Sequence, residues 1–356
     1  MAKIHTVQVE LGREPDALFL GGPDMTVTRN LPRWDSGFAY GGKLDWRGAG
    51  EPLIVLQVKP NVCGMLVAGL AELPPPAEVA ARLTGLRQDR GRIWDLPLEF
   101  DLDRSNHFAN LYATAGAAGL PPYLAILHGA APELRDDNAL GAGLYWDRSA
   151  LLARTARHFE TPWGPLDVLL GEAAEEYWRV HQQAAEFAAL RRVLFAERLL
   201  GPVQVLSNHL HQGLTSPEEM YLGCHPVFGP EELLPFMVRR EAPGFLLRGR
   251  AQLGPEVLEN TNLATRAREL GVYQRLTEAH LLPHGSGYAV PGPGHVERRE
   301  LAGRPRVYLH RGDQETDNPR EMIIGYRGEE VLRHTLALGL GELVCTLEFV
   351  STVVAP

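Results

Sequence analysis

One cysteine and several histidines stand inside or just after apolar, strand-like stretches of this chain, and they are the side chains best suited to bind a metal ion. Cys63 follows the apolar run 53–58 and lies in the segment Pro-Asn-Val-Cys-Gly-Met. Three histidines occupy comparable positions later in the chain: His107, His128 and His209. A thiolate and several imidazoles are the ligands that a soft-to-borderline divalent cation prefers. The set and its order, rather than any one motif, predict a metal site.

Each of these residues also has an ordinary structural interpretation. A lone cysteine is most often a buried, unreactive side chain, and a lone histidine is most often held by hydrogen bonds. Gly64 indicates close backbone packing beside Cys63, which suits a crowded site. His128 ends the run 123–127, and the end of an interior strand is where α/β enzymes place their sites.

A further histidine lies in a glycine-rich turn. His284 begins the sequence His-Gly-Ser-Gly, in which Gly285 and Gly287 allow backbone amides to approach an anion such as a phosphate. An imidazole in that setting can act as a nucleophile toward a nucleotide phosphate. The alternative is a simple turn, because such loops are common.

Taken in order, these segments resemble the motifs of the RtcB family of RNA ligases over nearly the whole chain. The matching segments are Pro23-Asp24, 37–42, Cys63-Gly64-Met65, Asn106-His107-Phe108, His128-Gly129, Asn208-His209, His284-Gly285-Ser286-Gly287, 330–332 and 345–350. Each match is weak alone, and the specificity of the resemblance comes from their common order.

The resemblance implies one RtcB-like α/β (α+β) domain over residues 1–356, with mixed sheets and a metal site at strand ends. It implies a manganese centre in which Cys63 bridges two Mn²⁺ ions and His107 binds one of them. His128 and His209 would bind the other ion. Zn²⁺ or Co²⁺ would suit the same ligands.

The activity implied by the resemblance is GTP-dependent RNA ligation. His284 would be guanylylated from GTP, and the guanylate would activate an RNA 3′-phosphate or 2′,3′-cyclic phosphate end for joining to a 5′-hydroxyl end. The implied nucleotide-binding residues are Asn106, Asn208, Gly285, Ser286 and Gly287. The partners would be GTP and the RNA ends of tRNA splicing or RNA repair, either tRNA halves or broken RNA.

Several charged groups of the family's site are replaced in this chain. Pro60 stands where the family has a metal-binding Asp, Asn110 where it has an acidic guanine contact, and Tyr288 where it has an Arg. Each lost charge-assisted hydrogen bond costs roughly 1.5–3 kcal/mol. Two alternatives therefore stay open, namely a metal-dependent phosphoesterase on the same scaffold and a non-catalytic protein that binds RNA ends. Whether His211 or His225 also binds the metal ion is left open by the sequence.

The composition is typical of a soluble, cytoplasmic protein. The 356 residues are 45% apolar and 22% charged, with a formal net charge of −9. An acidic total does not exclude nucleic acid, because a local basic groove can bind it. Three cysteines are too sparse for a disulfide framework and favour a reducing compartment. We expect no membrane partner, because no apolar run reaches the ~18 residues needed to span a bilayer.

The hydrophobic pattern predicts helices and strands in irregular alternation, which favours an α/β or α+β fold. The clearest element is a helix over 171–198, with apolar residues at three- and four-residue spacing. Shorter helices are expected at 78–83 and 329–336. Strands are expected at 4–10, 92–100, 122–127, 203–206 and 343–354, and a long ordered loop at 29–51.

Overall fold

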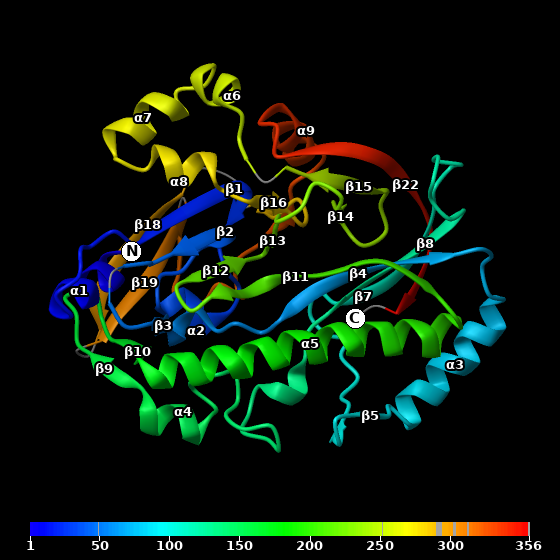
Figure 1. Cartoon of the computed structure of the whole chain (residues 1–356), viewed down its shortest axis with the longest axis horizontal. Coiled ribbons are helices and arrows are strands. Elements are labelled where there is room, and N and C mark those ends of the chain that lie inside the picture. The colour runs from blue at the N-terminus through cyan, green and yellow to red at the C-terminus, as the bar shows by residue number, and fades with distance from the viewer. Residues whose placement is uncertain (49, 251, 290–293, 302–303, 312, 355–356) are drawn as a thin grey trace.

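The computed structural model describes residues 1–48, 50–250, 252–289, 294–301, 304–311 and 313–354, and it contains a ten-stranded sheet with helices around it (Figure 1). Neighbouring strands of this sheet are antiparallel. Their spatial order is β1 (Leu18–Thr26), β2 (Tyr40–Asp45), β12 (Glu219–Leu222), β11 (Gln204–Ser216), β4 (Cys63–Leu70), β8 (Tyr123–Gly129), β7 (Phe108–Ala113), β22 (Gly341–Val354), β15 (Gly244–Gly249) and β14 (Leu233–Met237). The predicted mixture of helix and strand is confirmed.

The centre of this sheet is apolar on both faces. The long helix α5 (Glu172–Leu200) runs along one face of the central strands (Figure 1). Leu66 of β4 and Leu127 of β8 belong to the core cluster shared with α5. Their neighbours Met65 and Ile126 belong to a second cluster, because successive side chains of a strand point to opposite faces. The candidate site described below lies at the edge of this second cluster.

Smaller elements surround the sheet. The helix α3 (Pro76–Gln88) packs against α5. Further helices are α2 (Leu31–Asp35), α4 (Ala150–Thr155), α6 (Pro255–Glu259), α7 (Leu263–Glu269), α8 (Tyr273–Thr277) and α9 (Glu330–Ala337). Further strands are β3 (Leu53–Val55), β9 (Arg157–Phe159), β10 (Leu166–Leu170), β13 (Cys224–Pro226), β16 (Leu281–Pro283), β17 (Tyr288–Ala289), β18 (His295–Leu301), β19 (Arg304–Arg311), β20 (Gln314–Thr316) and β21 (Gly325–Tyr326). None of the described helices is both long and apolar enough to cross a bilayer.

The elements with the strongest sequence patterns are confirmed. Helices α3, α5 and α9 match the helices predicted at 78–83, 171–198 and 329–336. Strands β8, β11 and β22 match the strands predicted at 122–127, 203–206 and 343–354.

Three predictions of secondary structure are wrong in whole or in part. Residues 4–10 belong to a helix, α1 (Ala2–Glu10), which buries Ile4, Val7 and Gln8 at helical spacing. The expected loop at 29–51 contains α2 and β2. The expected strand at 92–100 is a small hairpin of β5 (Arg92–Ile93) and β6 (Leu96–Pro97).

Candidate metal centre

Three neighbouring strands bring a thiol and two imidazoles together in the interior. Cys63 is the first residue of β4, His128 lies near the end of β8, and His211 lies in β11. Their ligand atoms all lie within 4.8 Å of one another, and all three side chains are buried. Because the strands are antiparallel, the start of β4 meets the end of β8 at the same edge. The chain therefore has a buried cysteine–histidine cluster that can bind a metal ion.

The distances within this cluster are those of direct polar contact. The Cys63 Sγ lies 3.1 Å from His128 Nε2, and that nitrogen lies 3.2 Å from His211 Nε2. His107, which directly precedes β7, places its Nε2 3.4 Å from the same sulfur. Burial raises the pKa of the Cys63 thiol, but His128, His107 and His211 outweigh burial and lower it well below its usual value.

The three histidines around Cys63 differ in charge. Burial lowers the pKa of His107, but Cys63 and Asp101 outweigh burial and raise it to about 10. His107 is thus a cation between two anions. Burial lowers the pKa of His128, and it lowers the pKa of His211 to about 3. These two rings are neutral at physiological pH, as metal-binding imidazoles must be.

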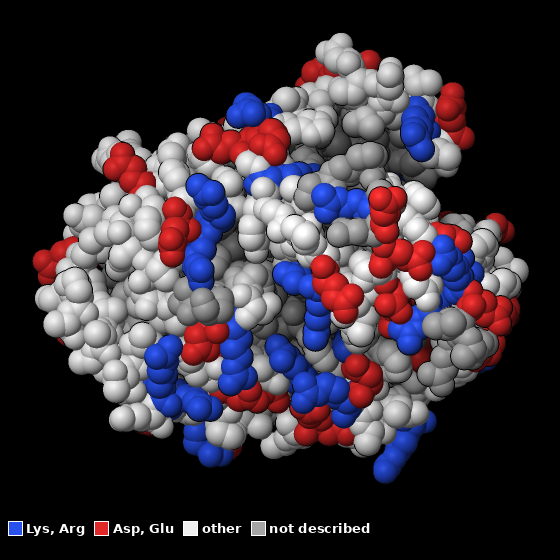
Figure 2. All heavy atoms as spheres, turned by 180° about the vertical axis from the view of Figure 1, so that it is seen from behind, with Lys and Arg blue, Asp and Glu red and all other residues white. Residues whose placement is uncertain are grey.

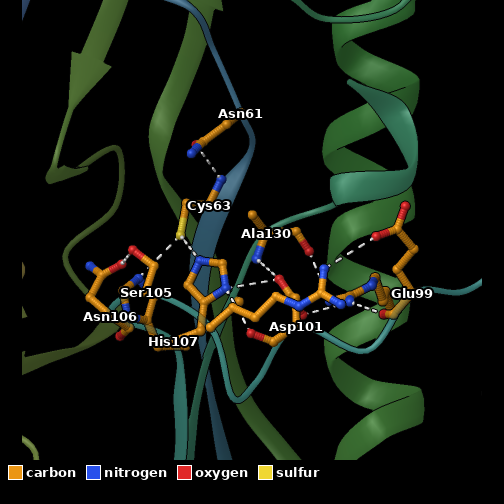
Figure 3. Close-up of polar contacts among 12 residues, drawn as sticks. Asn61, Cys63, Glu99, Asp101, Ser105, Asn106, His107 and Ala130 are labelled. Carbon is orange, nitrogen blue, oxygen red and sulfur yellow. Dashed lines mark hydrogen bonds and ion pairs between the residues drawn. The ribbon is translucent and has the colours of Figure 1, made fainter. Parts of the chain in front are cut away.

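A buried carboxylate fixes the orientation of His107. Asp101 Oδ2 lies 2.8 Å from His107 Nδ1 (Figure 3). The other oxygen of Asp101 lies 2.6 Å from Arg191 Nη2. Arg191 also pairs with Glu133 Oε1 at 2.8 Å. Burial raises the pKa of Asp101, but Arg191 and His107 outweigh burial and lower it. Asp101 is therefore ionised and holds the His107 ring toward the sulfur.

The tautomer of His128 follows from its backbone contact. Its Nδ1 lies 2.8 Å from the carbonyl oxygen of Asn106. A carbonyl can only accept a hydrogen bond, so Nδ1 carries the proton and Nε2 presents its lone pair to Cys63 and His211.

An irregularity in β11 determines which histidine of that strand joins the cluster. The pairing of β11 with β4 shifts between Leu210, opposite Gly64, and Gln212, opposite Cys63. The extra residue is His211, and a bulge of this kind redirects a side chain. His209, the predicted ligand, is instead paired with Met65 outside the group of three ligand residues. The group that could hold a metal ion therefore includes His211 of this strand, and it does not include the predicted His209.

Two arginines of α5 connect the helix to the strands that carry the cluster. Arg191 binds Asp101, as described above. Arg192 donates to Asn208 Oδ1 at 2.7 Å and to the carbonyl oxygen of Gly129 at 3.2 Å. Asn208 also donates to the carbonyl oxygen of Ala189 at 2.9 Å. The structure therefore gives Asn208, a predicted nucleotide ligand, a role in joining β11 to α5.

The donor set fits a soft-to-borderline divalent ion. It combines one thiolate with two neutral imidazole nitrogens, and such sulfur and nitrogen donors suit Zn²⁺ or Co²⁺ better than Mn²⁺, which prefers oxygen ligands. The Nδ1 of His211 is buried without a hydrogen-bond partner among the described residues. A neutral imidazole protonated on this atom directs its Nε2 lone pair at the cluster.

His284 lies next to this cluster. Its ring stacks on His211 with a centroid separation of 4.3 Å and an interplanar angle of 21°. Its Nδ1 lies 2.6 Å from the carbonyl oxygen of Gly223 and 3.7 Å from Asp24 Oδ2. The Gly223 contact places a proton on Nδ1, so in the neutral tautomer the lone pair is on Nε2. Burial raises the pKa of Asp24, whose other oxygen has no hydrogen-bond partner among the described residues.

A cavity of about 290 Å³ opens beside the cluster and is lined by His107, His128 and His284. Its other lining residues include the predicted nucleotide-binding residues Asn106, Gly285, Ser286 and Gly287, and also Asp24, Arg239, Arg240, Tyr288 and Tyr326. The turn at 284–287 is held in place because Ser286 Oγ donates to the carbonyl oxygen of Val238 at 2.8 Å. The volume is at the lower end of the range for small-molecule sites, roughly 300–1,000 Å³.

Several site residues were not predicted. Asp101 and Arg191 were given no role, although Arg191 and Arg192 interrupt the apolar side of α5 and are buried there. Two adjacent arginines at buried positions of a helix need an acidic or polar partner in the interior, and this sequence feature could have indicated their role. Gly223, which orients His284, carries no such signal because it acts through its carbonyl group.

Comparison with known protein families found no family model that matches this chain, and comparison with curated proteins found no match either.

Proposed function

We propose that this chain is a metal-dependent RNA ligase of the RtcB type that acts through a covalent nucleotide on His284. The observation that carries the proposal is the position of this ring. It stacks on His211 of the cysteine–histidine cluster, its Nδ1 is engaged by Gly223, and it lines the cavity. A neutral imidazole held in this way is a nucleophile at Nε2.

In the first step, His284 Nε2 attacks the α-phosphorus of GTP. The nitrogen–phosphorus bond forms, the bond to the bridging oxygen breaks, and pyrophosphate leaves with the electron pair. The ring becomes positively charged, and the Gly223 carbonyl and the Asp24 carboxyl group, 3.7 Å from Nδ1, stabilise this charge.

In the second step, an oxygen of an RNA 3′-phosphate attacks the same phosphorus and the bond to His284 breaks, which returns the ring to its neutral form. A 5′-hydroxyl then attacks the RNA phosphorus, loses its proton to water and displaces GMP. A 2′,3′-cyclic phosphate end would first be opened by water to a 3′-phosphate. The histidine thus divides one difficult transfer into smaller steps.

Cys63, His128 and His211 would hold the metal ion, for which we propose Mn²⁺, as the resemblance implies, with Zn²⁺ or Co²⁺ as the alternatives that the donor set suits better. A bound ion at this position supplies Lewis-acid polarisation of a phosphoryl oxygen. Around it, the exposed Asn106, Arg239 and Arg240 lie at the cavity, where they can bind phosphate oxygens.

The distribution of surface charge indicates which part of the chain would attract RNA. The face shown in Figure 2 carries basic and acidic side chains interspersed, and the chain has a net charge of −9. Attraction would therefore come from local cations at the cavity rather than from a broad basic surface. Binding should weaken as salt is raised, because phosphate contacts release counterions.

The test is covalent labelling with α-³²P-GTP in the presence of Mn²⁺, Zn²⁺ or Co²⁺. We expect a label that survives denaturation and is released by acid, as a phosphoramidate is. His284→Gln should abolish it, and His334→Gln, an exposed histidine of α9, should retain it. A wild-type chain that takes no label with any of these ions, or a label that persists in His284→Gln, would refute the proposal.

A second candidate, a metal-dependent phosphoesterase, is favoured by the surroundings of Asn110. This residue is 1% exposed and donates to Tyr112 Oη at 3.0 Å and to the carbonyl oxygen of Arg240 at 2.5 Å. It is buried and is not among the described residues that line the cavity, so it would not offer the guanine contact that the RtcB family has at this position. Release of phosphate from RNA 3′-phosphate ends that requires Cys63 but neither GTP nor His284 would favour this candidate over ligation.

A further inference from the structure

We propose that the sheet of β18, β19 and β20 carries a second metal site, for a borderline divalent transition-metal ion such as Zn²⁺, formed by His295, Glu297 and His310. Their ligand atoms all lie within 4.8 Å of one another. His295 and Glu297 lie on β18, and His310 lies on β19. Two imidazoles and one carboxylate are a common three-ligand set for Zn²⁺, with a fourth position open to water.

The strand register explains why these side chains converge. His295 is directly opposite His310, and Glu297 is opposite Tyr308. Residues that are opposite each other, and residues two apart on one strand, share a face of the sheet. The two imidazole rings lie 4.5 Å apart with an interplanar angle of 6°. Backbone pairing therefore aligns the two rings without any metal, so less ordering is needed when an ion binds.

Two carboxylates lie beside the His310 ring and give this part of the sheet surface negative charge. Glu297 Oε2 lies 2.8 Å from His310 Nε2, and Glu315 of β20 lies 3.4 Å from His310 Nδ1. Arg299 lies between these carboxylates, with contacts of 2.8 Å to Glu297 and 2.8 Å to Glu315. A divalent ion would replace the guanidinium as the cation on Glu297.

On the opposite face of this hairpin, apolar side chains of β19 anchor it to the rest of the chain. Leu309 is buried in a small cluster with Trp34 and Met322, and Val307 packs against the same cluster. Trp34 Nε1 donates to the carbonyl oxygen of Val307 at 3.0 Å. The proposed ion would join β18 to β19 on the outer face, directly behind this contact. We expect metal binding to slow the opening of the hairpin.

The test measures zinc bound per chain by equilibrium dialysis and elemental analysis. We expect His310→Ala and His295→Ala each to weaken one Zn²⁺ site by about a hundredfold or more, since even the outer partners of metal ligands are worth roughly 10–100-fold in affinity. His158→Ala is the matched control, because His158 also contacts two carboxylates, those of Glu160 and Asp167. The His158→Ala variant should bind as much zinc per chain as the wild type.

Two further measurements separate this site from the Cys63 cluster. Cys63→Ala should leave the His310-dependent ion bound, and Co²⁺ at the hairpin should lack the sulfur charge-transfer band that a thiolate ligand gives. Hydrogen exchange at β18 and β19 should slow when Zn²⁺ is added, and His310→Ala should remove this effect. Equal zinc binding by wild type, His295→Ala and His310→Ala would overturn the proposal and leave the cluster as an ion-pair network alone.

Discussion

Asp101 Oδ2 lies 2.8 Å from His107 Nδ1, while the other oxygen of the same carboxylate lies 2.6 Å from Arg191. The carboxylate thus links α5 to the ring that contacts the Cys63 thiolate. A histidine held in this way keeps a fixed tautomer and orientation. The consequences of removing this link can be measured.

Asp101→Asn should raise the pKa of Cys63, because His107 loses the anion that keeps it protonated beside the sulfur. Thiolate absorbance followed against pH measures this shift. Divalent-metal affinity should fall by roughly 10–100-fold. Unfolding in urea should show a loss of about 3 kcal/mol, because Arg191 keeps only Glu133 as an acidic partner. Asp103→Asn, a half-exposed neighbour, is the control, and an equal effect there would contradict this account.

His211→Ala should weaken divalent-metal binding by about a hundredfold, whereas His209→Ala should leave it nearly unchanged. The two residues lie on the same strand, so they are a matched pair for the effect of the bulge between Leu210 and Gln212. Isothermal titration with Zn²⁺ or Co²⁺ provides the measurement. The opposite order of effects would show that the bulge does not select the ligand.

Gly64→Ala should destabilise the fold by about 1–3 kcal/mol, the usual range for overpacking. A Cβ at this position would lie 2.5 Å from the carbonyl oxygen of His209 and 2.9 Å from Arg192 Cζ, so β4 and β11 would have to separate. Gly85→Ala in α3 is the matched control, because its Cβ would meet nothing within 4 Å. It should stabilise the chain by roughly 0.5–1 kcal/mol in urea unfolding. Similar effects of both substitutions would contradict the close approach at Gly64.

Stability should fall as the pH drops below about 6.5, the usual histidine value, and His181 should contribute to this fall. Burial lowers the pKa of His181 to about 3, and its Nε2 accepts a hydrogen bond from the Leu214 N–H at 3.1 Å. Between the two values the unfolded chain binds more protons, so the free energy of unfolding decreases by up to about 1.4 kcal/mol per pH unit. His181→Gln keeps an acceptor but cannot titrate, so it should show a shallower slope than His334→Gln. Equal slopes would exclude His181 as a source.

The sequence predicted α5 well because its apolar spacing repeats over many turns. The strand prediction for residues 4–10 was wrong because Val7 and Val9 fit a strand-like alternation while Ile4 and Val7 fit a helical spacing, and the segment is too short to distinguish the two. The segment 29–51 also contains β2, whose Gly41 and Gly42 have low strand propensity, and Gly42 is held in the sheet by pairing with both β1 and β12. Whether such a short or glycine-rich segment becomes a helix or a strand depends on its contacts with segments far away in the sequence.

The site could be predicted as a list of residues but not as an arrangement. Cys63 and His128 were identifiable because each is a polar or reactive side chain beside an apolar run. The choice of His211 over His209 depends on a shift in strand pairing, which is a property of two segments together. The role of Arg191 likewise depends on a carboxylate, Asp101, that lies far away in the chain.

The bulge that carries His211 exists only through pairing with β4, and this has a consequence for biosynthesis. A growing polypeptide holds Cys63 and His128 well before residue 211 leaves the ribosome, so the complete set of donor atoms forms only after more than half of the chain has been made. Until then the reactive sulfur lacks the strand that encloses it. A cation that binds this cluster would therefore meet all three donor atoms only once β11 has paired with β4.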